Sequence, residues 1–301
     1  LDWLIMVPIL DLVKGYLTEA SKGEAKLSPE LVEEFKEACG EALKRQFNPQ
    51  KKEWRLRMSS LGKPLCQQQL DKKQLPKDIE YNAVMRFLMG DLVEASAIFI
   101  MKAAGIDIEH TQKEVATDVG GENIKGTLDV KIDGKVWDIK SASPYAFTNK
   151  FGNYGGYNKL KDDDPFGYLA QGYGYAKAEK VPFGGWIAVN KSTGEWSICE
   201  APREQEEESK EALDKASENV VALVKNKPFK KLFEPKDEKI KIKGEDVFTG
   251  NKLMAMSCSF CNYKYHCWPK AELHKKVATR AVNRPMVWYT KLKEEDLENC
   301  L

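Results

Sequence analysis

The fold of this chain is decided by Gly126-Thr-Leu-Asp-Val-Lys-Ile-Asp-Gly-Lys-Val-Trp-Asp-Ile-Lys140. Apolar and polar residues alternate on either side of Asp133-Gly134, which is the strongest short-range signal for a β-hairpin closed by a two-residue turn. Such a turn pairs Ile132 with Lys135, and every other cross-strand pair follows from that one. The sequence therefore predicts two antiparallel strands with a defined register.

In that register two acids face each other across the hairpin. Asp129 lies opposite Asp138, and Lys140 shares their face. The other face carries an apolar set suited to a core, which consists of Leu128, Val130, Ile132, Trp137 and Ile139. Two carboxylates about 5 Å apart repel each other unless a cation lies between them. The acidic face is therefore either a site for Mg²⁺ or Mn²⁺, or an exposed surface on which Asp and Lys side chains pair.

The rest of the chain alternates helical and extended patterns around this hairpin. Apolar residues at helical spacing predict a long helix over about 79–104, which Gly105 ends. A shorter helix is expected at about 166–180. Strand patterns cover 113–119, 124–132, 136–141, 186–189 and 195–199. We therefore expect an α/β protein with a central mixed or antiparallel sheet flanked by helices.

Three regions are expected along the chain, and we expect them to form one integrated domain. Residues 1–77 form a helical region that carries Cys66, and residues 78–200 form the α/β core. Residues 201–301 form a second helical region, which is highly charged and contains a cysteine cluster. No stretch stays apolar for the length that a membrane span needs, so we expect no membrane contact and a cytoplasmic location.

Composition limits the functional classes. With 301 residues, 42% of them hydrophobic, the chain is long enough to bury a sizeable core. Its formal net charge of +1 gives no overall basic signal, so a nucleic-acid surface has to be a local patch. One basic run is Lys225–Lys243, with eight lysines against three acids, although such runs are also typical of a solvated surface.

The acids and the lysine of the hairpin resemble the PD-(D/E)XK nuclease superfamily. The matching order is Gly126-Thr127-Leu128-Asp129, followed by Asp138-Ile139-Lys140. The resemblance implies a restriction-endonuclease-like core in residues 78–200. It also implies that Asp129, Asp138 and the backbone carbonyl of Ile139 hold one or two Mg²⁺ or Mn²⁺ ions at the scissile phosphate. Lys140 would position the attacking water or help to deprotonate it.

Two further motifs resemble the RecB-like branch of that superfamily, and with the hairpin they span about residues 86–190. Gly90-Asp91-Leu92-Val93-Glu94 lies on the expected long helix, where that branch carries a Gly followed four residues later by a metal-binding His or Glu. Glu94 would be a third metal ligand. Gly90 lies on the same helix face and has no side chain, so the Glu94 carboxylate would have space to reach the sheet. Gln171-Gly-Tyr-Gly-Tyr175 matches the Gln-x-x-x-Tyr motif of the branch, so Gln171 and Tyr175 would contact DNA or organise the site.

Three of the seven cysteines, Cys258, Cys261 and Cys267, crowd into ten residues. Thiols this close in a cytoplasmic protein usually bind metal. Their spacing resembles the iron–sulphur nucleases of the RecB-like branch, including AddB-type helicase-nucleases and CRISPR-associated nucleases, which have one further Cys before the core. The resemblance implies a structural [4Fe–4S] cluster on these three residues and Cys66. The alternative is a zinc ion held by the three cysteines and His266.

The resemblance implies a Mg²⁺- or Mn²⁺-dependent DNA exonuclease that acts in recombination, repair or phage DNA metabolism. Its partner would be DNA, at ends or as single strands, together with a helicase or recombination protein that the sequence does not identify. The alternatives are an endonuclease of restriction or junction type, and a non-catalytic DNA-binding protein on the same fold. Further candidate DNA contacts are Ser141, Ser143, Lys150, Phe151, Tyr154, Tyr157 and Lys159.

Overall fold

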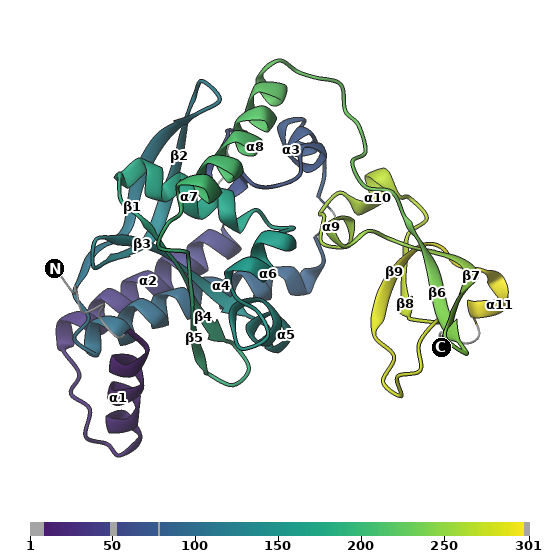
Figure 1. The fold of residues 1–301 in the computed structure, drawn as a ribbon. Helices are drawn as coiled ribbons and strands as arrows, with labels where there is room; N and C mark the ends of the chain where they lie inside the picture. The colour runs from purple at the N-terminus through teal and green to yellow at the C-terminus, as the bar shows by residue number, and fades with distance from the viewer. Residues whose placement is uncertain (1–8, 49–52, 78, 298–301) are drawn as a thin grey trace. The chain divides into compact units, whose positions relative to one another are not determined.

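The chain folds into two compact units in a computed structural model that describes residues 9–48, 53–77 and 79–297 (Figure 1). The first unit consists of Leu1–Gly62 and Glu80–Val224. The second consists of Lys63–Ile79 and Lys225–Leu301. A short segment near residue 70 therefore belongs with the C-terminal part of the chain, although it lies far from that part in sequence.

The first unit is built on a mixed sheet with the strand order β1-β2-β3-β4-β5. Its strands are β1 (Ile108–Val119), β2 (Glu122–Ile132), β3 (Lys135–Ala142), β4 (Phe183–Asn190) and β5 (Trp196–Glu200). Only β3 and β4 run parallel, and the other neighbours are antiparallel. Its helical segments are α1 (Ile9–Ser21), α2 (Pro29–Phe47), η1 (Met58–Ser60), α4 (Tyr81–Ala103), α5 (Pro144–Ala146), η2 (Phe147–Phe151), α6 (Tyr157–Asp162), α7 (Tyr168–Glu179) and α8 (Glu206–Val224).

The main elements predicted for this unit are confirmed. The five strands form within a few residues of the expected positions, and α4 and α7 occupy the two expected helical ranges. Helix α4 ends just before Gly105, whose φ of +79° is a conformation that glycine adopts without steric strain. The α/β class with a mixed central sheet is therefore confirmed, and the finer assignment to a restriction-endonuclease-like core stays a prediction.

The central hairpin has the predicted register at its turn. Ile132 pairs with Lys135, and two further pairs follow in the same register. Asp133 and Gly134 have φ values of +50° and +65°. Positive φ at both central residues is the requirement of a type I′ turn, which explains why an Asp-Gly sequence closes this hairpin.

One face of the sheet carries most of the predicted apolar set. Val130, Ile132, Trp137 and Ile139 pack in one cluster, to which α1 and α4 also contribute side chains. Leu128 was expected on the same face, and this prediction is wrong because Leu128 packs in the cluster on the opposite face. The alternation of side chains along β2 therefore changes between Leu128 and Val130.

The pairing of β1 with β2 is interrupted at the same place. The register pairs Thr111 with Val130 and Lys113 with Leu128, and leaves out Gln112 and Asp129 between them. Gln112 has a φ of +50°, in the left-handed region that non-glycine residues rarely adopt. A local reversal of this kind shifts the side-chain faces of both strands, and it lies at one of the predicted catalytic acids.

The second unit is built on an antiparallel sheet with the strand order β6-β7-β9-β8. Its strands are β6 (Lys236–Ile242), β7 (Glu245–Leu253), β8 (Glu272–Lys275) and β9 (Met286–Lys291). Its helices are α3 (Leu65–Lys72), α9 (Met256–Ser259), α10 (Lys264–Cys267) and α11 (Glu294–Leu297).

The expectation of a helical region over 201–301 is correct for α8 and wrong for the sheet that follows it. Lys and Ile alternate from Lys239 to Ile242, which is the period of a half-buried strand. Lys243 and Gly244 then have φ values of +51° and +92°, so they close a tight hairpin between β6 and β7. The high lysine content of this stretch conceals the alternation, because a run of charge is also typical of an exposed helix.

Helix α3 is held in the second unit by hydrogen bonds to segments that follow α8. The side-chain amide of Gln69 donates to the carbonyl oxygen of Lys227 at 2.8 Å. The hydroxyl of Tyr263 donates to Asp71 Oδ1 at 2.6 Å. These contacts bring Cys66, on the first turn of α3, into the same unit as the C-terminal cysteines.

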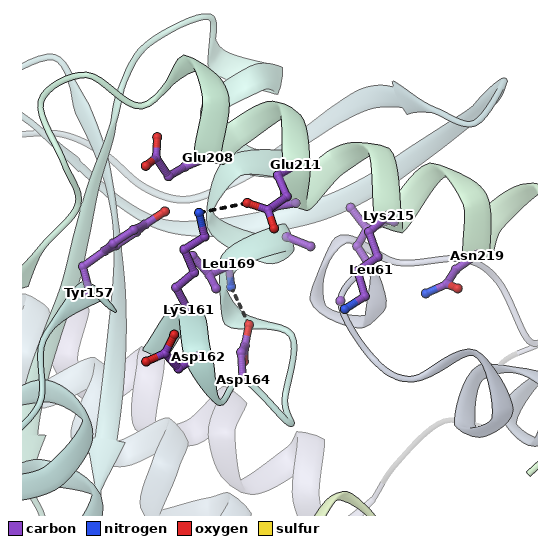
Figure 2. A pocket seen from close by; sticks show the side chains of 14 residues that line it. Leu61, Tyr157, Lys161, Asp162, Asp164, Leu169, Glu208, Glu211, Lys215 and Asn219 are labelled. Atoms are coloured by element: carbon purple, nitrogen blue, oxygen red, sulfur yellow. Dashed lines mark hydrogen bonds and ion pairs between the residues drawn. The ribbon is translucent and has the colours of Figure 1, made fainter. Parts of the chain in front are cut away.

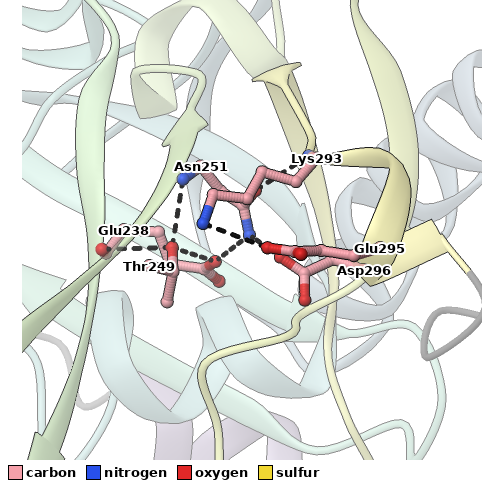
Figure 3. A network of polar contacts seen from close by, with 6 residues as sticks. All are labelled: Glu238, Thr249, Asn251, Lys293, Glu295 and Asp296. Atoms are coloured by element: carbon pink, nitrogen blue, oxygen red, sulfur yellow. Dashed lines mark hydrogen bonds and ion pairs between the residues drawn. The ribbon is translucent and has the colours of Figure 1, made fainter.

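A buried carboxylate organises the second sheet. Glu238 on β6 is fully buried and accepts hydrogen bonds from Thr249, Asn251, Tyr289 and the backbone N–H of Ala278. Figure 3 shows that Asn251 also connects this carboxylate to the segment around Lys293 and Asp296. Burial by itself would raise the pKa of Glu238, but these hydrogen bonds hold it below its usual value, so the ion is stable inside the unit.

Replacing Glu238 by Gln is expected to lower the free energy of unfolding of the second unit by about 2–4 kcal/mol, because an amide N–H would then face the Asn251 donor. The folded-state pKa of Glu238 is depressed, so its contribution is present above the unfolded-state pKa and is lost as the pH falls through the folded value. Denaturant unfolding over a pH series measures both effects. Glu245→Gln, at an exposed position of β7, is the matched control, and equal stabilities of the two variants would contradict the assignment.

Within the described ranges, each helix is either too short or too polar to cross a lipid bilayer.

Candidate functional site

The predicted acids and lysine come from three neighbouring elements of the first unit. Glu94 lies on α4, Asp129 on β2, and Asp138 and Lys140 on β3. Backbone pairing between β2 and β3 covers Val130 with Trp137 but not the two acids beyond that pair. There Asp129 Oδ2 instead accepts a hydrogen bond from the backbone N–H of Ile139 at 2.7 Å. The strands are thus bridged by a side chain at the position where the two acids were predicted to oppose each other.

Asp138 is the most deeply buried polar group of the site, with an exposed fraction of 2%. Lys140 Nζ lies 2.6 Å from Asp138 Oδ2 and forms an ion pair with it. The other carboxylate oxygen, Asp138 Oδ1, is buried and has no hydrogen-bond partner among the described residues. A buried carboxylate in this state is costly, and oxygen atoms without hydrogen-bond donors are suitable ligands for a hard cation.

The pKa of each of the three acids is raised above its usual value. Burial is the largest cause for each of them. Burial, followed by the negative charges of Asp138 and Asp91, raises the pKa of Glu94 to about 7. Burial, followed by the charges of Asp138 and Glu94, raises the pKa of Asp129 well above its usual value. The cluster therefore holds more negative charge than Lys140 alone neutralises.

Lys140 stays protonated in this setting. Burial alone would lower its pKa, but the charges of Asp138, Tyr168 and Asp129 outweigh burial and raise the pKa above its usual value. The ring of Tyr168 covers the ammonium group, with 4.5 Å between Nζ and the ring centroid, which is a cation–π contact. A lysine held in this way serves as a fixed positive charge and is a poor proton acceptor.

Tyr168 was not predicted, and its position depends on the loop before α7. Asp164 caps that helix, because its carboxylate accepts backbone hydrogen bonds from Gly167, Tyr168 and Leu169 at 2.8–2.9 Å. A Cβ added at Gly167 would lie within 2.4 Å of backbone atoms of Gly62, so the two chain segments touch directly. An Asp-rich run followed by Pro is typical of a helix start, so a capping role for Asp164 is recognisable in the sequence. The contact of Tyr168 with Lys140 is not indicated by any local sequence pattern.

Gln171 and Tyr175 lie on α7, one turn apart, as predicted. Burial is the main reason that the pKa of Tyr175 is raised; the charges of Asp129 and Asp138 raise it further, and a hydrogen bond with Gln171 opposes them. Tyr175 is only 3% exposed, so its side chain is buried inside the fold and does not offer a surface for DNA. It packs on Gly126, where an added Cβ would lie 2.8 Å from the tyrosine ring.

Gln112 is a site residue that no sequence motif indicated. Its side-chain amide donates to Glu94 Oε1 at 2.5 Å, from the left-handed backbone position described above. Strained backbone conformations of non-glycine residues persist where the surrounding structure requires them, often at functional sites. Gly90, by contrast, does not play the predicted part, because a Cβ built there meets no atom within 4 Å.

The predicted DNA contacts of the Gly-rich loop are partly wrong. Phe151 and Tyr157 are 4% and 8% exposed and belong to the core beside Trp186, so neither can stack on a base. Lys150 is bound to the carboxylate and carbonyl of Asp163. Tyr154 and Lys159 are exposed. Ser143 caps α5 by accepting a hydrogen bond from Ala146 at 3.3 Å, and nothing in the structure tests a role for Ser141.

The four predicted cysteine ligands all lie in the second unit. Burial raises the pKa of each thiol, to about 11 for Cys261, and Cys66, Cys258 and Cys267 lie close enough to raise it further by their charges. Three of the sulfurs receive hydrogen bonds: Cys66 from the backbone of Leu232, Cys258 from the Trp268 side chain, and Cys261 from the backbone of Tyr263. His266, the alternative zinc ligand, packs its ring edge-on against Phe229.

Neither cluster has its side chains converged on a single point. In the part of the chain that the structure describes, no group of three or more His, Cys, Asp or Glu side chains is arranged to hold a metal ion. In the acid cluster, Glu94 Oε1 accepts a hydrogen bond from Gln112, and Asp138 pairs with Lys140. A metal ion there would require Asp138 to exchange its contact with Lys140 for one with the metal.

A separate cleft of about 220 Å³ lies in the first unit between α6 and α8 (Figure 2). Its lining mixes acids and lysines, and Lys161 spans it to form an ion pair with Glu211 at 2.8 Å. The four central residues Glu94, Asp129, Asp138 and Lys140 do not line it. The cleft shares only the capping residue Asp164 with their surroundings.

Comparisons with known proteins do not assign the chain to a family. No protein-family model matches its sequence, and no curated protein matches it either. Among solved structures, the chain is similar to a protein described as "Crystal structure of SSO0001". The two share 13% sequence identity with a TM-score of 0.41, over 77% of this chain and 95% of that one.

Proposed function

We propose that the chain is a Mg²⁺- or Mn²⁺-dependent DNA nuclease that hydrolyses phosphodiester bonds at DNA ends. One observation carries the proposal: three carboxylates from three elements lie together, one buried and two partly buried, and the charge of Asp138 raises the pKa of both Glu94 and Asp129. Such repulsion destabilises the fold unless the cluster binds a cation, and strongly perturbed acids in one place are typical of functional sites. The buried Oδ1 atom of Asp138, which has no hydrogen-bond partner among the described residues, supports a hard cation as the ligand.

The roles of the residues follow from their surroundings. A bound divalent cation would neutralise negative charge at the phosphate and make a water molecule acidic enough to attack it. Glu94, Asp129, Asp138 and the Ile139 carbonyl would hold that cation. Lys140, which stays protonated, would orient the phosphate and stabilise its developing charge rather than remove a proton.

The two residues of the α7 motif would act from the inner side of the site. Tyr175 is buried against Gly126 and bonds to Gln171, so together they would fix the position of Asp129. Tyr168 would keep the Lys140 ammonium from turning away from the acids.

For the second unit we propose a structural [4Fe–4S] cluster on Cys66, Cys258, Cys261 and Cys267. Support comes from their common placement in one unit and from the hydrogen bonds that three of the sulfurs receive. Such bonds stabilise thiolates and tune metal–sulfur centres. A cluster there would tie α3 to the C-terminal segments, and a zinc site that uses His266 is the alternative.

The nuclease proposal is tested by digestion of matched linear and closed circular DNA, as duplex and as single strand, with Mg²⁺ or Mn²⁺ or with EDTA. We expect metal-dependent degradation of linear DNA and survival of closed circles. Cleavage of closed circles would replace the exonuclease by an endonuclease. Inertness of the anaerobically purified chain on every substrate would overturn the proposal.

Gln112→Gly separates a positioning role of Gln112 from a structural one. The change removes the hydrogen bond to Glu94 and relieves the left-handed backbone, so stability should stay within about 1 kcal/mol of the wild type or rise. Mn²⁺ affinity should fall about 10-fold, because residues that orient ligands contribute on this scale. Calorimetric Mn²⁺ titration and thermal unfolding measure the two effects.

Gln74→Gly is the matched control, since Gln74 has nearly the same φ, +51°, and lies in the second unit. It should leave Mn²⁺ affinity unchanged. If Gln112→Gly lowers stability and leaves metal affinity at the wild-type value, Gln112 has no positioning role.

A further inference from the structure

The two units carry opposite net charge, although the whole chain carries +1. The segments of the second unit contain 21 Lys and Arg against 12 Asp and Glu, a net charge of +9, which leaves −8 for the first unit. The excess of positive charge favours a polyanionic partner for the second unit.

Part of the positive charge lies on the hairpin formed by β8 and β9. From Glu272 to Lys291 the chain contains five Lys and Arg against one acid, Glu272 at the start of β8. The loop between the strands, residues 276–285, extends beyond them as the yellow segment in Figure 1. Every residue from Arg280 to Met286 is exposed, and Val282 is 99% exposed.

The base of this hairpin is fixed to the rest of the second unit. The backbone N–H of Ala278 donates to Glu238 at 3.1 Å, and that of Val277 donates to the hydroxyl of Tyr289 at 2.9 Å. Arg280 donates to the carbonyl oxygen of Lys241 on β6 at 2.9 Å. The hairpin is therefore an arm with an anchored base and an exposed tip, which lowers the entropy lost when the tip binds a partner.

The amino acids of the hairpin tip favour duplex over single-stranded nucleic acid as the partner. Proteins that hold single strands stack bases on aromatic side chains, and residues 276–285 contain none. Proteins that enter a duplex groove use arginines to contact phosphates and the groove floor, often together with an apolar side chain. Arg280 and Arg284 flank Val282 in this arrangement.

We propose that the β8–β9 hairpin is an arm that binds duplex DNA, with Arg280 and Arg284 at the phosphates of a groove and Val282 at its floor. The choice of DNA among duplex nucleic acids rests on the proposed nuclease function.

The test is the salt-dependent binding of labelled oligonucleotides by the full chain in Ca²⁺, measured by fluorescence anisotropy. Arg280→Ala/Arg284→Ala should weaken duplex binding about 10-fold or more and reduce the magnitude of the salt slope by about 2, because two phosphate contacts are lost. Lys225→Ala/Lys227→Ala is the matched control, with the same loss of charge at exposed sites of the same unit. It should change binding much less.

Several results would overturn the arm. The first is an equal loss of duplex affinity in the two double variants. The second is an equal loss of affinity for single strands and for duplexes in the arm variant. The third is an affinity for heparin that equals the affinity for duplex and falls by the same factor in the arm variant. A preference for duplex RNA over duplex DNA would also overturn it. Binding is measured without turnover, so an inactive wild type would contradict the nuclease and leave the result on the arm intact.

Discussion

Asp138→Asn is expected to abolish metal-dependent DNA cleavage, with a loss of about 10³-fold or more, while it stabilises the metal-free protein. The loss of activity follows from the removal of a buried ligand oxygen and of the charge that fixes Lys140. The gain in stability follows from the removal of one charge from a cluster in which the acids repel one another. Rate measurements under single-turnover conditions and thermal unfolding in EDTA give the two values.

The pH dependence of stability should distinguish the same two proteins. The folded-state pKa of Glu94, about 7, lies above its ordinary value, so the folded chain binds more protons than the unfolded chain between the two values. The metal-free wild type should therefore lose stability as the pH rises from about 4.5 to about 7. Asp138→Asn should weaken that loss, because the Asp138 charge contributes to the raised pKa of Glu94.

The matched control for this variant is Asp133→Asn in the turn of the same hairpin. Asp133 is exposed and has a φ of +50°, which Asn tolerates as well as Asp does. It should retain activity and wild-type stability. If Asp138→Asn retains activity, or destabilises the metal-free protein, the acid cluster is not the metal site that we propose.

Replacing Cys261 by Ser is expected to remove the iron of the second unit, from about four atoms per chain to near zero, together with its visible absorption. The second unit should then unfold at a much lower denaturant concentration, because metal binding and folding are coupled in such sites. Iron content, absorption and unfolding of anaerobically purified protein are the measurements. Cys39→Ser, at a partly buried cysteine of the first unit, is the matched control and should leave all three unchanged.

The iron–sulphur cluster and the zinc site predict different metal contents and respond to different variants. Wild-type protein that contains one zinc and no iron would support the alternative site, and His266→Ala should then lose the zinc. Wild-type protein with neither metal, or a second unit whose stability does not change in Cys261→Ser, would contradict both sites.

The parts of the fold that could be predicted from sequence are those set by local chemistry. The Asp133-Gly134 turn fixed the hairpin register, and helical periodicity placed α4 and α7. These predictions succeed because turn geometry and amphipathic period act over a few residues. The motif residues on these elements, Asp138 and Lys140 above all, were brought together for the same reason.

The remainder depends on tertiary contacts that no short pattern encodes. A glutamine in the middle of a strand gives no sign of a left-handed backbone, so neither Gln112 nor the shift of Leu128 to the other face was predictable. The contact of Tyr168 with Lys140 depends on the close approach of Gly62 and Gly167, which are far apart in sequence. The second sheet was missed because its lysine-rich strands resemble an exposed helix in composition.

The central claim is that the acids of the first unit bind a divalent cation, and calorimetric titration with Mn²⁺ tests it most directly. We predict binding by the wild type that releases protons near pH 7, because the pKa of Glu94 is about 7 and a bound cation would lower it. Affinity should rise with pH, and Asp129→Asn/Asp138→Asn should abolish binding. Absence of Mn²⁺ binding by the wild type, or equal affinity in the double variant, would contradict the claim.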